Sequence, residues 1–309
     1  MKIPTWRTVP VDRVVGGRPL LFSQPAILFL VLTAFSLCWL FPSRFDVAAA
    51  QDRKLTPGEL VSRHLEAIGS AESRAKVSSR VVSGNSKLVL LIGGAANLDG
   101  TAMIVSSGPK FRFGMQFSTP DYTGEDMAFD GSRAATGLLP QGRRSPLSNF
   151  LNSQSQPLKE GLMCGVLSTA WPLLRMDQLQ PRLEYRGLKK IDQRQLHELS
   201  YRARKGGDDL KVLLYFDPET WRHVGSKYSF EIGASIGTRE VANMNTETYF
   251  SVTESFDDFR LVDGLTLPHQ YKLKYSAEGK GASVIYDWTL IISRISHSES
   301  FDSQLFTIK

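Results

Sequence analysis

The sequence predicts a mainly β protein of the α+β type, with a strongly curved antiparallel sheet, or half-open β-barrel, covered by a few helices. From Arg80 onward most segments alternate apolar and polar residues with a period of two, as strands with one buried face do. Turn signatures separate these segments, among them Asp130-Gly131, Asp217-Pro218 and Asp263-Gly264. The pattern leaves no room for the long crossovers that parallel strands need, so we expect an antiparallel meander.

The first 50 residues resemble a signal peptide. Ala26 to Phe41 is an uncharged apolar run of sixteen residues, shorter than the ~20 residues of a membrane-spanning helix, and four basic residues precede it. Ala48-Ala49-Ala50 follows, and its small residues predict cleavage after Ala50. The alternative, an uncleaved anchor, would also place the body outside the cytoplasm. We expect an exported, periplasmic protein whose residues 51–309 form a single domain.

The composition is that of an ordinary globular domain. The chain is 42% hydrophobic and 22% charged, with 37 basic and 31 acidic residues, and five of the basic residues lie within the first 50. The remaining charges are nearly balanced and interspersed, which disfavours nucleic-acid binding. Beyond residue 50 the only cysteine is Cys164, so an intramolecular disulfide is impossible and Cys164 is expected to be a buried hydrophobe.

A helix is predicted at the start of the body. Thr56-Pro57-Gly58-Glu59 has the capping-box spacing, in which threonine accepts from a backbone amide and glutamate reaches back. Leu60, Val61, Leu65 and Ile68 form its apolar face. Gly69 ends it, and a short second helix is predicted over Glu72 to Val77.

The strand pattern is clearest from Lys110 to Ser118. The residues of one face there are Phe111, Phe113, Met115 and Phe117. Leu210 to Phe216 and Val284 to Ile292 alternate in the same way. Beyond the Asp263-Gly264 turn, the same is true of His269 to Tyr275.

One region interrupts the strand pattern. Residues 145–174 place leucines, Phe150 and Met163 at mainly helical spacings and end in Trp171-Pro172. Two short helices are predicted here, and they would cover one face of the curved sheet. Trp171 is then either a residue of this cover or a core aromatic.

Two tracts indicate a family. Tyr215 to Thr220 (YFDPET) and Phe256 to Pro268 (FDDFRLVDGLTLP), after an exported leader and a capped helix, resemble the LolA/LolB-like superfamily. Within it, the chain looks similar to exported proteins described as outer-membrane lipoprotein-sorting proteins. The resemblance implies a half-open barrel with a helical lid, whose apolar interior holds acyl chains without catalysis. It also implies a lipid or lipidated protein as partner, with an inner- or outer-membrane protein as a possible second one.

The resemblance assigns the apolar strand faces to a ligand cavity. The predicted lining residues are Phe111, Phe113, Met115, Phe117, Met127, Phe129, Trp171, Leu214 and Phe216. The alternative is that these side chains pack a closed core under the helices, which would make the protein a structural or scaffold domain of the envelope.

A catalytic alternative comes from Gly233-Ala-Ser235-Ile-Gly237, which matches the nucleophile-elbow pattern of serine hydrolases. Asp257 or Asp263, followed by His269 or His297, gives the chain order of the triad. The motif requires an alternating βα chain and a glycine-rich oxyanion loop upstream, and the meander pattern supplies neither. We therefore expect a protein that is not an enzyme.

The five histidines are dispersed and lack metal-binding spacings. His64 is expected to be exposed or to act as a cap, and His197 and His223 to face solvent. Phosphate-binding glycine motifs are also missing from the sequence, so we expect no metal and no cofactor.

Overall fold

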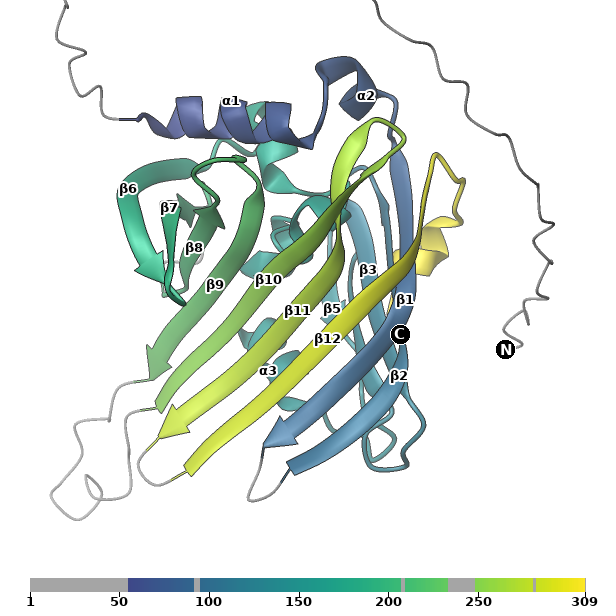
Figure 1. Ribbon diagram of the computed structural model, residues 1–309. Coiled ribbons are helices and arrows are strands. Elements are labelled where there is room, and N and C mark those ends of the chain that lie inside the picture. Colours follow the sequence, from purple (N-terminus) through teal and green to yellow (C-terminus); the bar gives the residue numbers. More distant parts are fainter. Residues whose placement is uncertain (1–54, 92–94, 207–208, 233–247, 280–281, 309) are drawn as a thin grey trace, which may run out of the picture. The chain divides into compact units, whose positions relative to one another are not determined.

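The computed structural model describes residues 55–91, 95–206, 209–232, 248–279 and 282–308 (Figure 1). Its main element is one sheet of twelve strands, in the spatial order β5-β4-β3-β2-β1-β12-β11-β10-β9-β8-β7-β6. The strands are β1 (Ser79–Leu91), β2 (Ala95–Ser107), β3 (Lys110–Phe117), β4 (Gly124–Phe129), β5 (Ala134–Thr136), β6 (Arg182–Ile191), β7 (Arg194–Arg202), β8 (Lys211–Phe216), β9 (His223–Ile232), β10 (Thr248–Val262), β11 (Leu265–Gly279) and β12 (Ala282–His297).

Every neighbouring pair in the sheet is antiparallel, and nearly all of them are consecutive along the chain. The exception is the pairing of β1 with β12, which joins the beginning of the body to its end. β5 and β6 are the two edges, so the curved sheet is not closed into a barrel (Figure 1). The predicted fold class, a mainly β protein with an open, curved antiparallel sheet, is confirmed.

The first helix, α1 (Pro57–Ile68), has the predicted cap at both ends. The Thr56 hydroxyl accepts from the Glu59 amide at 3.2 Å, and a Glu59 carboxylate oxygen accepts from the Thr56 amide at 2.9 Å. Gly69 ends the helix. The second helix, α2 (Ala71–Ala75), begins one residue earlier than predicted, because the Ser70 side chain caps it by accepting from the Ser73 amide.

The segment predicted as two helices is a chain of shorter pieces. These are α3 (Pro146–Ser153), α4 (Gln156–Lys159), η1 (Gly165–Leu167), η2 (Pro172–Leu174) and α5 (Met176–Leu179), and a further turn, η3 (Ser303–Phe306), lies near the C-terminus. Proline is the first or second residue of three of the pieces, and Cys164, Gly161 and Gly165 have positive φ angles, which interrupt a continuous helix. We call residues 145–180 the covering segment.

The predicted strand alternation is present. On β11, Tyr271, Leu273 and Tyr275 are buried, whereas Lys272 and Lys274 are exposed. The buried faces of the strands and the apolar side chains of the covering segment form one hydrophobic core. The core therefore lies between the concave face of the sheet and the covering segment.

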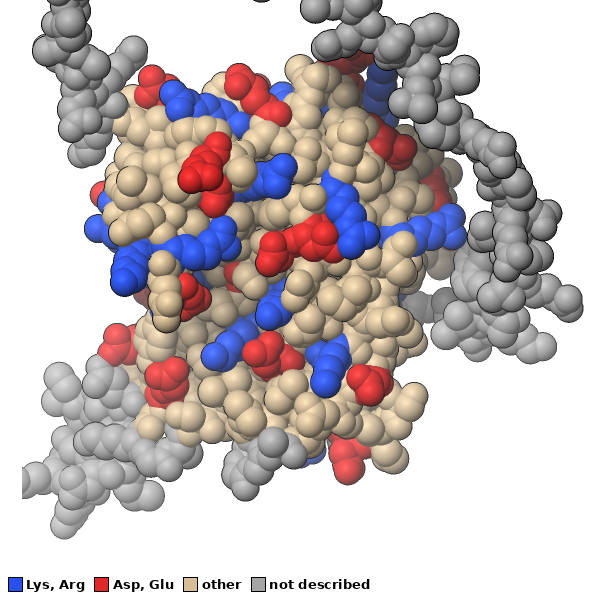
Figure 2. All heavy atoms as spheres, in the orientation of Figure 1, with Lys and Arg blue, Asp and Glu red and all other residues tan. Residues whose placement is uncertain are grey.

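On the face shown in Figure 2, basic and acidic side chains are interspersed.

The turn between β10 and β11 also matches its prediction. Asp263 and Gly264 both have positive φ angles, 49° and 78°, which a two-residue hairpin turn of this hand requires. Val262 pairs with Leu265 directly across the turn, so the turn sets the register of two long neighbouring strands. Among the described residues, no helix is both long enough and apolar enough to cross a membrane.

Candidate functional site

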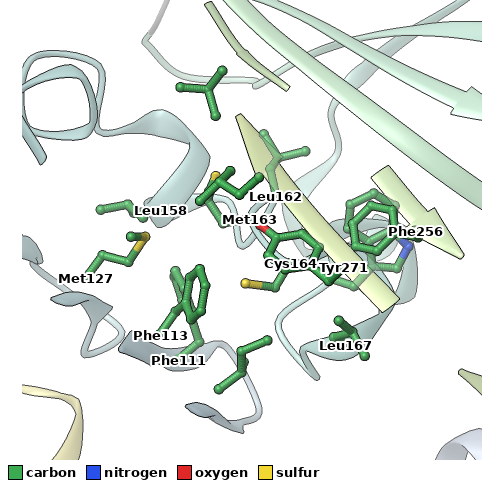
Figure 3. Packing of buried hydrophobic residues seen from close by; sticks show 14 of the residues in the cluster. Phe111, Phe113, Met127, Leu158, Leu162, Met163, Cys164, Leu167, Phe256 and Tyr271 are labelled. Atoms are coloured by element: carbon green, nitrogen blue, oxygen red, sulfur yellow. The ribbon is translucent and has the colours of Figure 1, made fainter. Parts of the chain in front are cut away.

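The nine side chains predicted to line a cavity are all buried in the same core. Their exposed fractions run from 0% for Phe111 to 8% for Phe129. Phe111 pairs with Phe129, and Phe113 with Met127, across β3 and β4. Figure 3 shows three of them, Phe111, Phe113 and Met127, beside Leu158, Leu162 and Met163 of the covering segment. The structure thus brings the candidates together under the covering segment, and the ligand that would contact them stays a prediction.

A buried carboxylate, Glu254 on β10, anchors the covering segment from below. Its Oε1 accepts from the backbone amide of Cys164 at 2.7 Å and from the hydroxyl of Tyr271 at 2.7 Å. Its Oε2 lies 2.6 Å from the hydroxyl of Tyr228, which also lies 3.0 Å from the carbonyl oxygen of Leu162. Glu254 is 3% exposed, so these partners replace the water that it loses.

Burial raises the pKa of Glu254 above its ordinary value, although the hydrogen bonds from Tyr228, Tyr271 and Cys164 act in the opposite direction. The geometry suits a neutral carboxyl group. One phenolic hydrogen on Tyr228 cannot serve both Glu254 and Leu162, whereas a proton on Oε2 could be donated to Tyr228 and free its hydrogen for Leu162.

A second buried carboxylate, Glu125 on β4, holds the start of the covering segment. It accepts from the hydroxyls of Tyr122, Ser145 and Ser148 at 2.6, 2.7 and 2.9 Å. Ser145 is also the N-cap of α3, where its side chain accepts from the Ser148 amide. Burial raises the pKa of Glu125. The two buried glutamates therefore connect the sheet to different parts of the covering segment.

Neither acid was predicted as a site residue from the sequence, although each stands at a position of its strand that the alternation marks as buried. Glu254 stands between Val252 and Phe256 on the buried face of its strand, and Glu125 precedes Met127 by two residues. A charged residue in register with a buried apolar face is rare unless it has partners. The partners, however, come from segments remote in the chain, which periodicity alone does not reveal.

Three buried rings connect α1, the covering segment and β9. Trp171 Nε1 donates to His64 Nε2 at 3.1 Å, and His64 Nδ1 donates to the carbonyl oxygen of Trp221 at 3.1 Å. The Trp171 ring stacks on His223 with centroids 4.5 Å apart. Phe216 packs against both histidines. Trp171 is therefore at once a residue of the cover and a core aromatic.

These contacts correct the predictions for the histidines. His64 was expected to be exposed or to act as a cap, and His197 and His223 to face solvent. All three are buried instead, with exposed fractions of 1%, 7% and 0%. The reason is spatial: α1 lies across the end of the sheet, so its His64 face meets Trp171 and Phe216. Burial lowers the pKa of His64 to about 4 and that of His223 well below its usual value. Both rings are neutral at pH 7.

The catalytic alternative finds little support among the described residues. Asp263 Oδ2 does lie 2.8 Å from His297 Nδ1, as a triad would require, but His297 Nε2 accepts a hydrogen bond from Arg80 Nε at 3.0 Å. His269 Nδ1 contacts the carbonyl oxygen of Leu267. Ser235 and both glycines of its motif lie outside the described residues.

Metal binding has no candidate site in the described ranges, where no three His, Cys, Asp or Glu side chains come close enough to share an ion. The two buried carboxyl groups under the covering segment are instead hydrogen-bonded to hydroxyl groups and to a backbone amide. They can anchor the segment, accept or release protons at Glu125 and Glu254, and orient aromatic rings.

Together the fold and the site define a class: a mainly β domain with an open, curved antiparallel sheet whose concave apolar face lies under a segmented helical cover. No family model and no curated protein matches the chain. Several solved structures of low sequence identity are similar to the chain over most of its length.

Three of these structures illustrate the likeness. A domain from Vibrio parahaemolyticus, provisionally assigned to outer membrane lipoprotein sorting, is 12% identical with a TM-score of 0.43, over 80% of this chain and 97% of that one. A LolA superfamily protein from Nitrosomonas europaea is 14% identical with a TM-score of 0.42, over 82% and 98%. A DUF1329 family protein from Desulfovibrio piger is 13% identical with a TM-score of 0.44, over 81% and 96%. Because the sequence identities and TM-scores are this low, these structures do not indicate the function of the chain.

Proposed function

We propose that the protein is an exported, periplasmic, non-catalytic carrier that holds the acyl chains of a lipid or a lipidated protein. The binding surface is the concave face of the sheet, and the covering segment moves aside to admit the chains. The supporting observation is that this segment is built of short helical pieces, which rest on apolar side chains and are tied down by a few buried polar anchors.

The energetics of this exchange are favourable. An acyl chain of about sixteen carbons gains over ~10 kcal/mol when it leaves water, at ~0.8 kcal/mol per methylene. Opening the segment breaks hydrogen bonds at Glu254 and Glu125, each worth about 0.5–1.5 kcal/mol for a neutral carboxyl group. A bound chain would then replace the apolar contacts that the covering segment gives up.

Cys164 provides an internal reporter of this opening. Its thiol is 0% exposed inside the covering segment, and burial raises its pKa well above the usual value, so it should react slowly with a maleimide in the closed state. We expect phospholipid vesicles to increase its modification rate at least several-fold, because chain uptake moves Cys164 away from Glu254. The variant Cys38→Ser leaves Cys164 as the only thiol.

The control variant is Cys164→Ser with Ser300→Cys, in the same Cys38→Ser chain. Ser300 is exposed near the C-terminus, outside the covering segment, so its thiol should react rapidly whether or not vesicles are present. Native mass spectrometry of protein purified from a bacterial periplasm gives an independent reading, and co-purified lipid is expected. If vesicles leave the maleimide modification rate of Cys164 unchanged and no lipid co-purifies, the carrier function is refuted.

That negative result would favour a second function, an envelope scaffold domain with a fully packed interior. The observation that favours a scaffold is the burial of all nine candidate side chains, each of which is 8% exposed or less. In a scaffold these residues serve only the core. Lipid would then neither copurify with the protein nor compete with an apolar fluorescent probe.

A further inference from the structure

A pocket of about 430 Å³ opens at one end of the sheet, apart from the nine candidate side chains. Its walls come from α2, the start of β1, the turn between β2 and β3, the covering segment from η1 to α5, and the start of β11. Its volume is within the ~300–1,000 Å³ of ordinary small-molecule sites. The pocket is notable for its charge, because three arginines line it: Arg74, Arg80 and Arg175.

Arg80 is the most deeply buried of the three, at 4% exposure. Its guanidinium donates from Nε to His297 Nε2 and from Nη1 to the carbonyl oxygen of Val166. Both partners are neutral acceptors: His297 Nε2 carries no hydrogen when it accepts from Arg80, and the single ring hydrogen on Nδ1 is directed to Asp263 at the surface. Burial lowers the pKa of Arg80 to about 10, which leaves it charged at neutral pH.

The other two arginines are held by the pocket wall in the same manner. Arg74 Nη1 donates to the carbonyl oxygens of Leu65 and Gly69 at the end of α1. Arg175 Nε donates to the side-chain oxygen of Gln178 at 3.3 Å, while its Nη1 is buried and has no hydrogen-bond partner among the described residues. Glu160 attracts Arg175 through space but does not line the pocket.

None of the described residues that line the pocket is acidic, whereas buried cations in proteins normally have an anionic partner. The remaining wall is largely apolar and includes Ile68, Val77, Leu174 and Leu265. Planar guanidinium groups suit the oxygens of phosphate and carboxylate groups, which they can bind in a bidentate manner. The missing partner is therefore an anion that arrives with the ligand.

We propose that this pocket binds the phosphate or carboxylate group of an anionic amphiphile, with Arg80 and Arg175 as its main ligands and the apolar wall beside the first carbons of its chain. This pocket is separate from the concave face, so a failure of the acyl-carrier proposal would not refute anion binding in the pocket, and the reverse also holds. Lipid head groups and free anions share this chemistry, and binding measurements can separate them.

Isothermal titration calorimetry of the purified protein with three probes tests the proposal. Octyl phosphate supplies an anion and a chain, inorganic phosphate supplies the anion alone, and octyl glucoside, used below its micelle concentration, supplies a neutral head group. We expect octyl phosphate to bind at least tenfold more tightly than octyl glucoside, with an affinity that falls as salt is added. Tighter binding of octyl phosphate than of inorganic phosphate identifies an amphiphile, and equal binding identifies a free anion in the same pocket.

Two substitutions assign the site. Arg80→Gln and Arg175→Gln should each weaken octyl phosphate binding at least tenfold, and Arg175→Gln decides the matter if Arg80→Gln does not fold. The matched control is Arg112→Gln, which removes a half-buried arginine that already has its own carboxylate partner, Asp126, outside the pocket. Equal binding of octyl phosphate and octyl glucoside would overturn the proposal. So would the absence of binding at millimolar concentration, or wild-type affinity in Arg175→Gln.

Discussion

Arg80 Nε donates to His297 Nε2 over 3.0 Å, so the imidazole nitrogen that a serine hydrolase would use as its base is already occupied. The acid next to this histidine, Asp263, holds its other nitrogen. The arrangement has the outline of a catalytic dyad, yet it orients an arginine towards a pocket instead of activating a nucleophile.

The first prediction follows from this pair. The protein should not react with a serine-directed fluorophosphonate, because His297 has no free nitrogen with which to activate Ser235. The measurement is labelling of the purified protein, followed by gel fluorescence, with a known serine hydrolase as positive control. Labelling that disappears in the Ser235→Ala variant would contradict the prediction and restore the hydrolase alternative.

The second prediction concerns His64 and pH. Its pKa is about 4 in the folded state against 6.5 in the unfolded chain, so the unfolded chain binds more protons between these values. Stability from this group is therefore full above pH 6.5 and is lost as the pH falls towards 4. The loss is about 3 kcal/mol, from a shift of about two and a half pKa units at 1.36 kcal/mol each.

A His64→Gln variant isolates this contribution. Glu125 and Glu254, whose pKa values are raised, act in the opposite direction, since they stabilise the fold at low pH and lose that contribution as the pH rises. They are present in both proteins and cancel in the comparison. Urea unfolding should show the variant losing most of its deficit between pH 7 and pH 4. A deficit that stays constant over this range would refute the role of His64.

The third prediction concerns the Glu254 anchor. Glu254→Ala leaves the amide of Cys164 and the hydroxyl of Tyr271 without acceptors, at about 1–3 kcal/mol each, so we expect a loss of about 2–6 kcal/mol. Glu254→Gln keeps one acceptor oxygen and should lose clearly less. The free energy of unfolding in urea is the measurement. Glu219→Ala, on an exposed turn, is the control and should stay within about 0.5 kcal/mol of wild type.

Equal stability of the Glu254→Ala and Glu254→Gln variants would show that the carboxyl group does not anchor the segment. The same two variants bear on the carrier function. If the anchor holds the covering segment closed, both should increase the rate at which a maleimide reaches Cys164 without any vesicles present.

The fourth prediction compares two glycines. Gly165 has a φ of +47°, and a Cβ there would lie 2.8 Å from His223 Nδ1 and 2.9 Å from Phe256 Cζ. His223 is stacked on Trp171 and cannot give way, so Gly165→Ala should cost about 1–3 kcal/mol. A Cβ added at Gly58 in α1 would meet no neighbouring atom within 4 Å, so Gly58→Ala should be neutral or stabilising by up to about 1 kcal/mol.

The stabilities of the two variants are measured by thermal and urea unfolding. Gly165→Ala should be less stable than wild type, and Gly58→Ala should not. Two alanine variants of equal stability would mean that the turn at Gly165 does not pack against His223 as described.

Local features of the chain were predictable, as two examples show. The Thr56 capping box and the Asp263-Gly264 turn each depend on a few adjacent residues, and both are present as expected. The alternation in Phe111 to Phe117 also identified a buried face correctly. By contrast, the covering segment has more and shorter pieces than the two helices predicted, because its prolines and positive φ angles limit each piece to a turn or two.

The sequence by itself determined which residues share a strand face, where the hairpins turn and how the first helix is capped, because period, turn chemistry and capping act over a few residues. Only the tertiary structure decided what lies against each face. His64 contacts Trp171, which is 107 positions away in the sequence, and Glu254 contacts Cys164, which is 90 positions away. The curvature of the sheet creates these contacts and gathers Arg74, Arg80 and Arg175 around one pocket, and a local pattern contains no information about such distances.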